Sequence, residues 1–301
     1  MLGGVKTFLE GSADDLYFQT IETQASELGD LAAFVSRYVP SSSTVLDVGA
    51  NIGLSAILLS RLVHRVIAYE PSPPNIAFLR RNLALNGVTN VEVRPVAVSD
   101  KPGTLRFQVA RFGAGSHVVS ADHLAAATVP TVDVPAIALD DEAHPPIAFI
   151  KMDAEGCEPE ALAGARLLLA RDRPLIYMEI NTWCLSAFAG HNLGTLVRTL
   201  WRAFDVGKPE PGGTVSQLPD PLDFLHSLIV DLRGTTDIIL RPCGGMQMPT
   251  LRELTWPESA LAALCDAAAP GAARLERHQR SDALAAPAHD RVTTETTSRP
   301  E

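Results

Sequence analysis

The chain has 301 residues, of which 46% are hydrophobic and 20% charged, and its formal net charge at pH 7 is -10. That amount of apolar material is enough to form one sizeable core. The acidic balance argues against a general binder of nucleic acids or anionic membranes, because such proteins collect phosphates with a basic face. We therefore expect a globular protein with no nucleic-acid partner.

The cysteines and the apolar segments indicate the cellular compartment of the protein. The four cysteines are Cys157, Cys184, Cys243 and Cys265. They form no CxxC pair and no Cys/His group at zinc spacing, so we expect reduced thiols and no metal site. The sequence has no charged start followed by an apolar run, and no apolar stretch approaches ~20 residues. These features predict a cytoplasmic protein without membrane insertion.

The two ends of the chain are patterned more weakly than its middle. Residues 1–25 are predicted to be a loosely attached lead-in, followed by a helix over 26–38 with apolar residues at helical spacing. Beyond Pro257, an Ala-rich helix is expected to fade into a polar tail, 281–301, which lacks apolar residues to order it. We divide the chain into a lead-in and helix (1–39), a main domain (40–245), and a C-terminal helix with a disordered tail (246–301).

The main domain alternates between strands and helices. Strands are predicted over 45–48, 65–69, 91–98, 147–152 and 175–180, and helices over 54–62, 76–86 and 161–170. Such alternation is typical of an α/β fold with a Rossmann-like, doubly wound, mostly parallel sheet and helices on both of its faces.

Two regions depart from this alternation. Within residues 100–140, the segments 105–109 and 129–136 alternate like strands, and we predict an insertion on the ligand side of the sheet. After Ile180, the pattern predicts a helix over 193–204, a loop rich in Pro and Gly over 207–221, and a last strand over 237–240. Acceptor specificity is expected in 100–140 and 181–235, because weakly patterned loops carry function.

The most informative stretch is Asp47-Val48-Gly49-Ala50-Asn51-Ile52-Gly53, which joins a buried strand to a helix. Glycines let a backbone turn sharply and approach a ligand closely, and ligands bind beyond the carboxyl ends of parallel strands. The dinucleotide pattern GxGxxG, aligned on Gly49, fails at Asn51 and Leu54, and no Walker loop is present. A turn kept only for tight packing is the alternative.

The stretch instead resembles the first motif of class I methyltransferases, with Asn51 in place of the usual middle glycine. This resemblance implies that the loop binds the amino-acid end of S-adenosylmethionine. The residues assigned to it are Asp47, Gly49, Ala50, Asn51 and Gly53.

Glu70 ends the second strand and precedes Pro71. A carboxylate at this position can accept hydrogen bonds from both hydroxyls of a ribose. Dinucleotide enzymes use the same feature, so Glu70 predicts a ribosyl ligand without distinguishing which one. A solvated charge at a strand end is the alternative.

Further segments follow in an order that resembles the FkbM family of methyltransferases. They are Tyr69-Glu70-Pro71, Asn82-Leu83-x-x-Asn86-Gly87, Ala97-Val98-Ser99-Asp100, Leu139-Asp140, Phe149 to Glu158, and Pro174 to Glu179. The sequence Ile-Lys-x-Asp-x-Glu-Gly-x-Glu, residues 150–158, resembles the most specific motif of that family. The resemblance implies the class I methyltransferase fold, S-adenosylmethionine as cofactor, and O-methylation of hydroxyls on sugars, glycans or polyketide-type products. It also implies that Ala97 to Asp100 line the adenine.

The reaction requires a base, because an alcohol is a poor nucleophile at neutral pH until it loses its proton. Asp153 is our first candidate for the base or for orienting the acceptor, and Glu155 and Glu179 are weaker ones. His117 is the rival base, because the unperturbed pKa of histidine lies near neutral pH. Glu158 is equally well explained by the dipole at a helix start.

Several alternatives stay open. A divalent metal could bridge Asp153 and Glu155, although no further ligands stand at a recognisable spacing. Trp183 and Phe188 could form a wall against a sugar ring, but ordinary packing is the simpler reading. The same cofactor residues would serve N- or C-methylation of a small metabolite, or a cofactor-binding scaffold without activity. The sequence does not indicate the acceptor or the oligomeric state.

Overall fold

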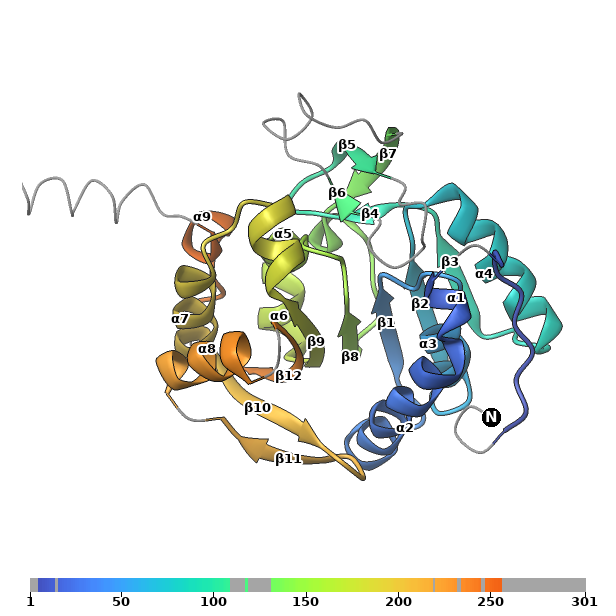
Figure 1. Cartoon of the computed structure of the whole chain (residues 1–301), viewed down its shortest axis with the longest axis horizontal. Coiled ribbons are helices and arrows are strands. Elements are labelled where there is room, and N and C mark those ends of the chain that lie inside the picture. The colour runs from blue at the N-terminus through green and yellow to red at the C-terminus, as the bar shows by residue number, and fades with distance from the viewer. Residues whose placement is uncertain are drawn as a thin grey trace, which may run out of the picture. The chain divides into compact units, whose positions relative to one another are not determined.

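The predicted alternation builds one large sheet in the computed structural model of the protein (Figure 1). This eight-stranded sheet has the order β11-β10-β12-β9-β8-β1-β2-β3. Its parallel part consists of β3 (Val91–Arg94), β2 (Arg65–Tyr69), β1 (Thr44–Val48), β8 (Ile147–Met152) and β9 (Leu175–Asn181). An antiparallel part follows, made of β12 (Thr235–Pro242), β10 (Phe204–Glu210) and β11 (Thr214–Gln217). The mostly parallel α/β architecture predicted from the sequence is confirmed.

The structure describes residues 5–13, 16–108, 117–118, 131–218, 220–231, 234–244 and 247–255. All of them belong to one compact unit, Met1–Trp256. The predicted Ala-rich helix beyond Pro257 and the polar tail lie outside the described residues. The boundaries proposed at 39/40 and 245/246 fall inside the compact unit and stay predictions.

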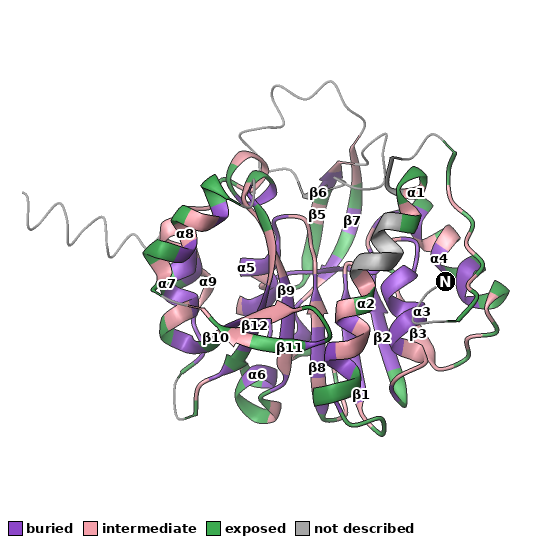
Figure 2. Ribbon diagram, turned by 60° about the horizontal axis from the view of Figure 1, so that its bottom comes forward, coloured by how far each residue is buried: buried purple, intermediate pink, exposed green. Residues whose placement is uncertain are grey.

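The central strands are largely buried (Figure 2), and their side chains divide between two hydrophobic cores. In β1, Val45 faces one core, whereas Leu46 and Val48 face the other. The first core is covered by α2 (Ile21–Tyr38), α3 (Leu54–Ser60) and α4 (Pro73–Leu85). The second is covered by α5 (Glu158–Ala163), α6 (Arg166–Asp172), α7 (Leu193–Ala203), α8 (Pro221–Val230) and α9 (Leu251–Leu254). Burial on both faces explains why these strands read as continuous apolar runs.

The predicted insertion, together with the short strand that precedes it, forms a second, smaller sheet near the carboxyl ends of β1 and β8 (Figure 1). Its order is β4-β7-β5-β6, with β4 (Ala97–Val98), β7 (Thr131–Ile137), β5 (Gly103–Gln108) and β6 (His117–Val118). The single strand predicted over 91–98 is wrong, because β3 ends at Arg94 and β4 belongs to the smaller sheet. Pro95 lies between them, and a proline cannot donate to a strand ladder.

The N-terminal segment is attached more firmly than predicted. The side chain of Asn86 bonds to both the N–H and the carbonyl of Phe8, at 3.0 and 2.6 Å. Asn82, fully buried in α4, bonds in the same way to Glu10, at 2.6 and 3.0 Å. A short helix, α1 (Leu16–Gln19), follows, and α2 begins at Ile21 rather than at residue 26. Hydropathy patterning cannot reveal an attachment that two amide side chains make to backbone groups.

The loop predicted over 207–221 is also wrong, because most of it is the hairpin of β10 and β11. Gly212 and Gly213 turn the hairpin with φ of +76° and +74°, a conformation that suits glycine. The turn is held to α2, where Asp30 accepts the N–H of Gly212 at 3.1 Å. Helix α8, which was not predicted, follows with Asp220 capping the N–H of Leu222 at 2.8 Å.

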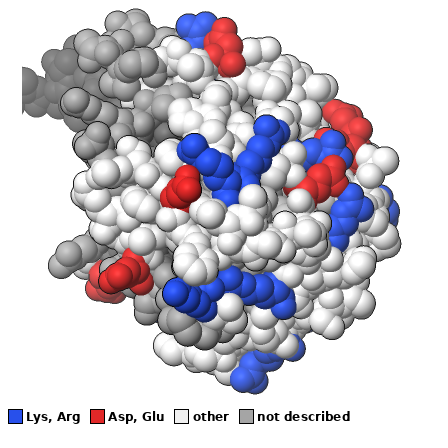
Figure 3. All heavy atoms as spheres, turned by 90° about the vertical axis from the view of Figure 1, so that its right-hand side faces the viewer, with Lys and Arg blue, Asp and Glu red and all other residues white. Residues whose placement is uncertain are grey.

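Basic side chains on the side of the protein that carries α4 and β3 stand beside acidic ones (Figure 3). Glu92 forms ion pairs with Arg65 and Arg94, and Arg81 pairs with Glu10. These pairs reduce the positive potential that a phosphate backbone would need. Among the described helices, none combines the length and the hydropathy required to cross a bilayer.

Candidate active site

The turn after β1 is shaped by its contact with the end of β8. Gly49 has a φ of +81°, and a Cβ placed on it would lie 1.7 Å from the carbonyl oxygen of Asp153. No side chain can therefore be added at Gly49 without displacing the backbone that carries Asp153. Asn51 has a φ of +51°, a region that asparagine tolerates better than most residues. The N–H groups of Gly49 and Ala50 both donate to Tyr69 at 3.0 Å, which fixes the turn to β2.

Glu70 connects the end of β2 to this turn. Its side chain is only 4% exposed. The carboxylate accepts the N–H of Asn51 at 2.8 Å, the N–H of Ser72 at 2.9 Å and the amide of Asn75 at 3.4 Å. Burial raises the pKa of Glu70 to about 7, and these hydrogen bonds oppose the shift. These three hydrogen bonds use only part of the acceptor capacity of the ionised carboxylate. Its remaining lone pairs can accept hydrogen bonds from ligand hydroxyls.

Asp47 and Lys151 form the buried base of the site. Asp47 is fully buried and accepts the hydroxyl of Ser55 at 2.8 Å. The Lys151 ammonium lies 4.0 Å from Asp47 Oδ1, 3.0 Å from Asp153 Oδ2 and 3.3 Å from the carbonyl of Gly49. Burial raises the pKa of Asp47, and the charge of Lys151 opposes that shift. Lys151 thus holds together the carboxylates of two adjacent strands.

The turn from β8 to α5 carries the predicted catalytic carboxylates. Glu155 has a φ of +51° and Gly156 a φ of +101°, so the chain reverses sharply here. Glu158 stabilises the reversal, because its buried carboxylate accepts the N–H of Ala154 at 2.8 Å and that of Gly156 at 3.0 Å. Burial raises the pKa of Glu158 to about 8, while its backbone hydrogen bonds oppose the shift. These contacts favour the structural interpretation of Glu158 over a role in binding substrate.

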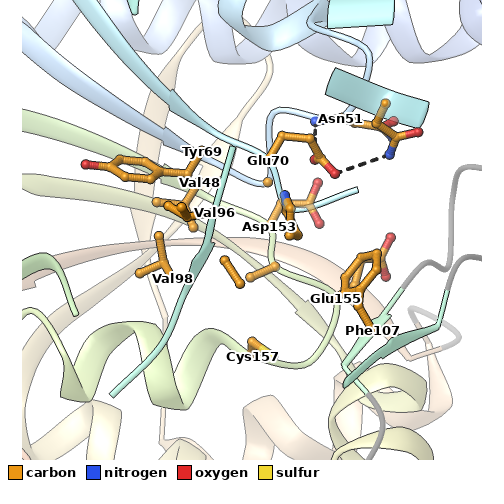
Figure 4. A pocket seen from close by; sticks show the side chains of 15 residues that line it. Val48, Asn51, Tyr69, Glu70, Val96, Val98, Phe107, Asp153, Glu155 and Cys157 are labelled. Atoms are coloured by element: carbon orange, nitrogen blue, oxygen red, sulfur yellow. Dashed lines mark hydrogen bonds between the residues drawn. The ribbon is translucent and has the colours of Figure 1, made fainter. Parts of the chain in front are cut away.

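A cleft opens between the ends of β1, β2 and β8 and the smaller sheet (Figure 4). Seven of the predicted site residues line it: Gly49, Asn51, Glu70, Pro71, Ala97, Asp153 and Glu155. The rest of the lining is Val48, Tyr69, Asn75, Val96, Val98, Phe107, Ala154 and Cys157. The cleft therefore has a polar end at Glu70 and Asn51 and an apolar part around Val48, Val96 and Val98 (Figure 4). We refer to it below as the cofactor cleft.

A second cavity, of about 280 Å³, lies on the face of the sheet that carries α2. It shares four lining residues with the cofactor cleft: Gly49, Asn51, Asp153 and Glu155. Its other walls are Leu28 and Leu31 of α2 with Ala50, Ser55, Lys151, Met152, Tyr177, Glu179, Asn181 and Asp237. We call it the acceptor cavity, after the role that we propose for it below. Two of the three carboxylate candidates, Asp153 and Glu155, thus stand at the boundary between two cavities.

Carboxylates dominate the wall of the acceptor cavity opposite α2. Glu179 and Asp237 are direct cross-strand partners in β9 and β12. Burial and the charges of Asp153, Glu155 and Asp237 raise the pKa of Glu179 far above its usual range. A shift in this direction favours the neutral carboxylic acid, which can both donate and accept a hydrogen bond.

Other predicted residues lie elsewhere. Asp47 and Gly53 line neither cavity, and Ala50 lines the acceptor cavity rather than the cofactor cleft. Asp100 also lies outside the cleft lining, where its carboxylate accepts the hydroxyl of Ser99 at 3.3 Å. The roles assigned to these residues stay predictions.

The insertion and the segment after β9 carry the remaining candidates. The backbone of His117 is in β6, which contacts the single π-helical turn η2 (Cys184–Phe188), but its side chain lies outside the described part of the chain. Trp183 is 67% exposed and meets Phe188 edge-on, with ring centroids 6.0 Å apart. Neither ring lines one of the two cavities. Within the described residues, no group of three or more His, Cys, Asp or Glu side chains is placed to hold a metal ion.

The family model described as "Methyltransferase FkbM domain" matches residues 47–197, a range that includes both carboxylate-bearing turns. The chain belongs to the FkbM methyltransferase family. It is similar to the methyltransferase sdnD of Sordaria araneosa, with 37% identity over 70 residues, which are 22% of this chain and 27% of sdnD.

Among solved structures, this chain is similar to methyltransferase FkbM from Methylobacillus flagellatus KT, with 20% identity and a TM-score of 0.40. The match covers 66% of this chain and 44% of that protein. It is also similar to an rRNA methylase from Streptococcus thermophilus, with 12% identity and a TM-score of 0.40 over 71% of this chain and 95% of that one. The matched part covers less than half of the length of sdnD and of the Methylobacillus protein.

Several site residues of this FkbM-family chain were not predicted from the sequence. Phe107 reaches the cofactor cleft from the insertion, and Asp237 reaches the acceptor cavity from the antiparallel strand β12. No local sequence pattern marks either residue as part of a site, because the position of each depends on the pairing of strands that are distant in the sequence. Lys151, in contrast, lies in the family motif two residues before Asp153. Its role as a link between carboxylates could therefore have been anticipated from the sequence.

Proposed function

We propose that this protein is an O-methyltransferase that uses S-adenosylmethionine and acts on a hydroxyl of a sugar, a glycan or a natural-product scaffold. Membership of the FkbM methyltransferase family supports methyl transfer. The observation that carries the proposal is the placement of Asp153 and Glu155 on the boundary shared by the cofactor cleft and the acceptor cavity. At such a boundary, a carboxylate can reach an acceptor hydroxyl in one cavity while the methyl donor occupies the other.

The described residues fit the charge pattern of the proposed cofactor. Asn51 Oδ1 is buried, has no hydrogen-bond partner among the described residues, and belongs to a residue that lines both cavities, so it can accept from the ammonium of the methionine end. Asp47 lines neither cavity and would support the site through its contacts with Ser55 and Lys151. Glu70 would accept the ribose hydroxyls, and the apolar part of the cleft would take the adenine. When bound, S-adenosylmethionine supplies an electrophilic methyl group on a sulfonium centre.

The protein's own chemical task is to handle the proton of the acceptor hydroxyl. The Asp153 carboxylate is oriented by Lys151 at 3.0 Å, and we assign it as the base or the group that orients the acceptor. Glu155, on the same turn, is the second candidate. In either case the proton passes from the acceptor oxygen to a carboxylate oxygen, and from there to solvent after product release.

The lining of the acceptor cavity supports a polyhydroxylated or amphipathic acceptor. Glu179, Asn181 and Asp237 offer oxygen acceptors for several hydroxyl groups. Leu28 and Leu31 provide an apolar wall on the opposite side, suited to the less polar face of a sugar ring or to a hydrocarbon scaffold.

The test is methyl transfer from labelled S-adenosylmethionine to a panel of methyl glycosides and polyketide-type alcohols, with products analysed by mass spectrometry and NMR. We expect the label on oxygen, and transfer slowed by ~10²–10⁴ in Asp153→Asn. Label on carbon would replace the proposal with C-methylation.

One observation favours a second candidate, N-methylation of a small amine. The acceptor cavity is lined by more carboxylates than cations, and a protonated amine would be attracted to it. The two candidates are separated by adding matched amino and hydroxy sugars to the same panel. A preference for the amino sugar with label on nitrogen would select the second.

A further inference from the structure

The segment after β9 begins with a side-chain cap. Asn181 Oδ1 accepts the N–H groups of Trp183 and Cys184, each at 3.2 Å. The π-helical turn η2 starts at Cys184, and such turns are rare and occur often at functional sites. Asn181 itself lines the acceptor cavity, so this cap ties the start of η2 to that cavity.

Cys184 contacts the turn from β8 to α5 through two different groups. Its thiol donates to Glu155 Oε2 at an Sγ–O distance of 3.0 Å. Its carbonyl lies beside Gly156, where an added Cβ would be 2.8 Å from the carbonyl oxygen. The side chain of Cys184 is buried, with the residue only 3% exposed. One residue of η2 therefore packs against the backbone of the turn that carries the catalytic candidates and donates a hydrogen bond to one of its carboxylates.

The charge around Glu155 explains why such a donor is needed. Glu155, Glu158 and Glu179 all lie near enough to Cys184 to raise the pKa of its thiol, and Asp153 is two residues from Glu155. Carboxylates in such a group repel one another when they are ionised, and a hydrogen-bond donor to one of them offsets that repulsion. Burial and the charge of Glu155 raise the pKa of the Cys184 thiol well above its usual range, so the thiol keeps the proton that it donates.

We propose that Cys184 is a positioning residue, whose thiol holds the Glu155 carboxylate at the boundary between the cofactor cleft and the acceptor cavity. The inference rests on the proposed function, in which Glu155 is one of the two carboxylates at the boundary between the cavities. Cys184 itself lines neither cavity, so it acts through Glu155 rather than on the reacting atoms.

Two substitutions separate hydrogen bonding from packing. Cys184→Ser keeps a donor of similar size, whereas Cys184→Ala removes it. Cys243→Ala is the matched control, because this thiol follows β12 and contacts Asp205 rather than the active site. With an acceptor found in the methyl-glycoside panel, we expect Cys184→Ala to lower kcat about tenfold, as typical for loss of a hydrogen bond to a charged group. The affinity for S-adenosylmethionine should be unchanged, and Cys184→Ser should recover most of kcat.

A spectroscopic measurement tests the contact without any acceptor. The S–H stretching band of Cys184 is assigned in the Raman spectrum by its loss in Cys184→Ala. A thiol that donates to a carboxylate has a lower S–H frequency than one that does not, so we expect the band to move up in Glu155→Ala and to stay in place in Cys243→Ala. A band unaffected by Glu155→Ala would overturn the inference.

The activity data separate this inference from the proposed function. If Glu155→Ala removes transfer while folded Cys184→Ala keeps the wild-type kcat, the positioning role of Cys184 is wrong and the proposed function stands. The same holds if Cys184→Ser is as impaired as Cys184→Ala. If Glu155→Ala keeps the full kcat, the role of Glu155 in the proposed function is wrong, whatever the thiol does.

Discussion

Gly156→Ala tests whether the turn from β8 to α5 is held as tightly as described. Alanine at a φ of +101° is strained by ~1–3 kcal/mol. Its Cβ would also lie 2.8 Å from the carbonyl oxygen and 3.0 Å from the carbonyl carbon of Cys184, so η2 must move. Forced overpacking of this kind typically costs ~1–3 kcal/mol. We therefore expect the free energy of unfolding to fall by ~3 kcal/mol and Tm by about 10 °C.

The matched control is Gly87→Ala, at the end of α4. Gly87 has a φ of +64°, and no atom lies within 4 Å of its hypothetical Cβ. Only backbone strain applies there, and we expect a loss of ~1 kcal/mol with methyl transfer intact. Urea unfolding measures both losses, and labelled transfer measures activity, which Gly156→Ala should reduce because the turn carries Asp153 and Glu155. Equal losses of stability in the two variants, with full activity in Gly156→Ala, would refute the contact between the turn and Cys184.

Three further predictions follow from the site and its supports. Asp153→Asn should lower kcat by ~10²–10⁴, while the Kd for S-adenosylmethionine, measured by calorimetry, stays unchanged. A normal kcat would show that Asp153 has no role in the mechanism. Because burial raises the pKa of Glu70 to about 7, the carboxylate is ionised at pH 8 and mostly protonated at pH 6. Cofactor affinity should therefore weaken as the pH falls from 8 to 6, and a flat profile would contradict the role of Glu70. Asn82→Ala should lower the free energy of unfolding by ~2–3 kcal/mol, because the backbone of Glu10 loses both of its hydrogen bonds to Asn82. It should also make residues 5–10 sensitive to protease. Unchanged proteolysis would show that this segment is held by other contacts.

The placement of Glu70, Asp153 and the turn after β1 around one cleft could be predicted from the sequence because its signals are local. The turn after β1 and Glu70 at the end of β2 follow buried strands directly, so the strand pattern places them at one edge of the sheet. Asp153 follows β8 in the same way. Each of these assignments needs only a strand, its end, and the general rule that ligands bind beyond the carboxyl ends of parallel strands.

The acceptor side could not be predicted, because its walls are built by long-range pairing. Asp237 faces the cavity only because β12 pairs antiparallel with β9 and places it opposite Glu179. Leu28 and Leu31 contribute from α2, which the sequence pattern treats as separate from the main domain. The hairpin of β10 and β11 was missed for a related reason, since Gly212 and Gly213 read equally well as a loop.

The central claim is that the cofactor cleft binds S-adenosylmethionine, and isothermal calorimetry tests it most directly. We predict binding of S-adenosylmethionine and S-adenosylhomocysteine to the wild type, and affinity reduced at least tenfold, as an order-of-magnitude estimate, in Glu70→Ala. Glu92→Ala, which changes a carboxylate of the neighbouring strand β3 outside the cleft, should bind like the wild type. NAD should give no binding heat. Binding of NAD, with none of either sulfur compound, would contradict the account.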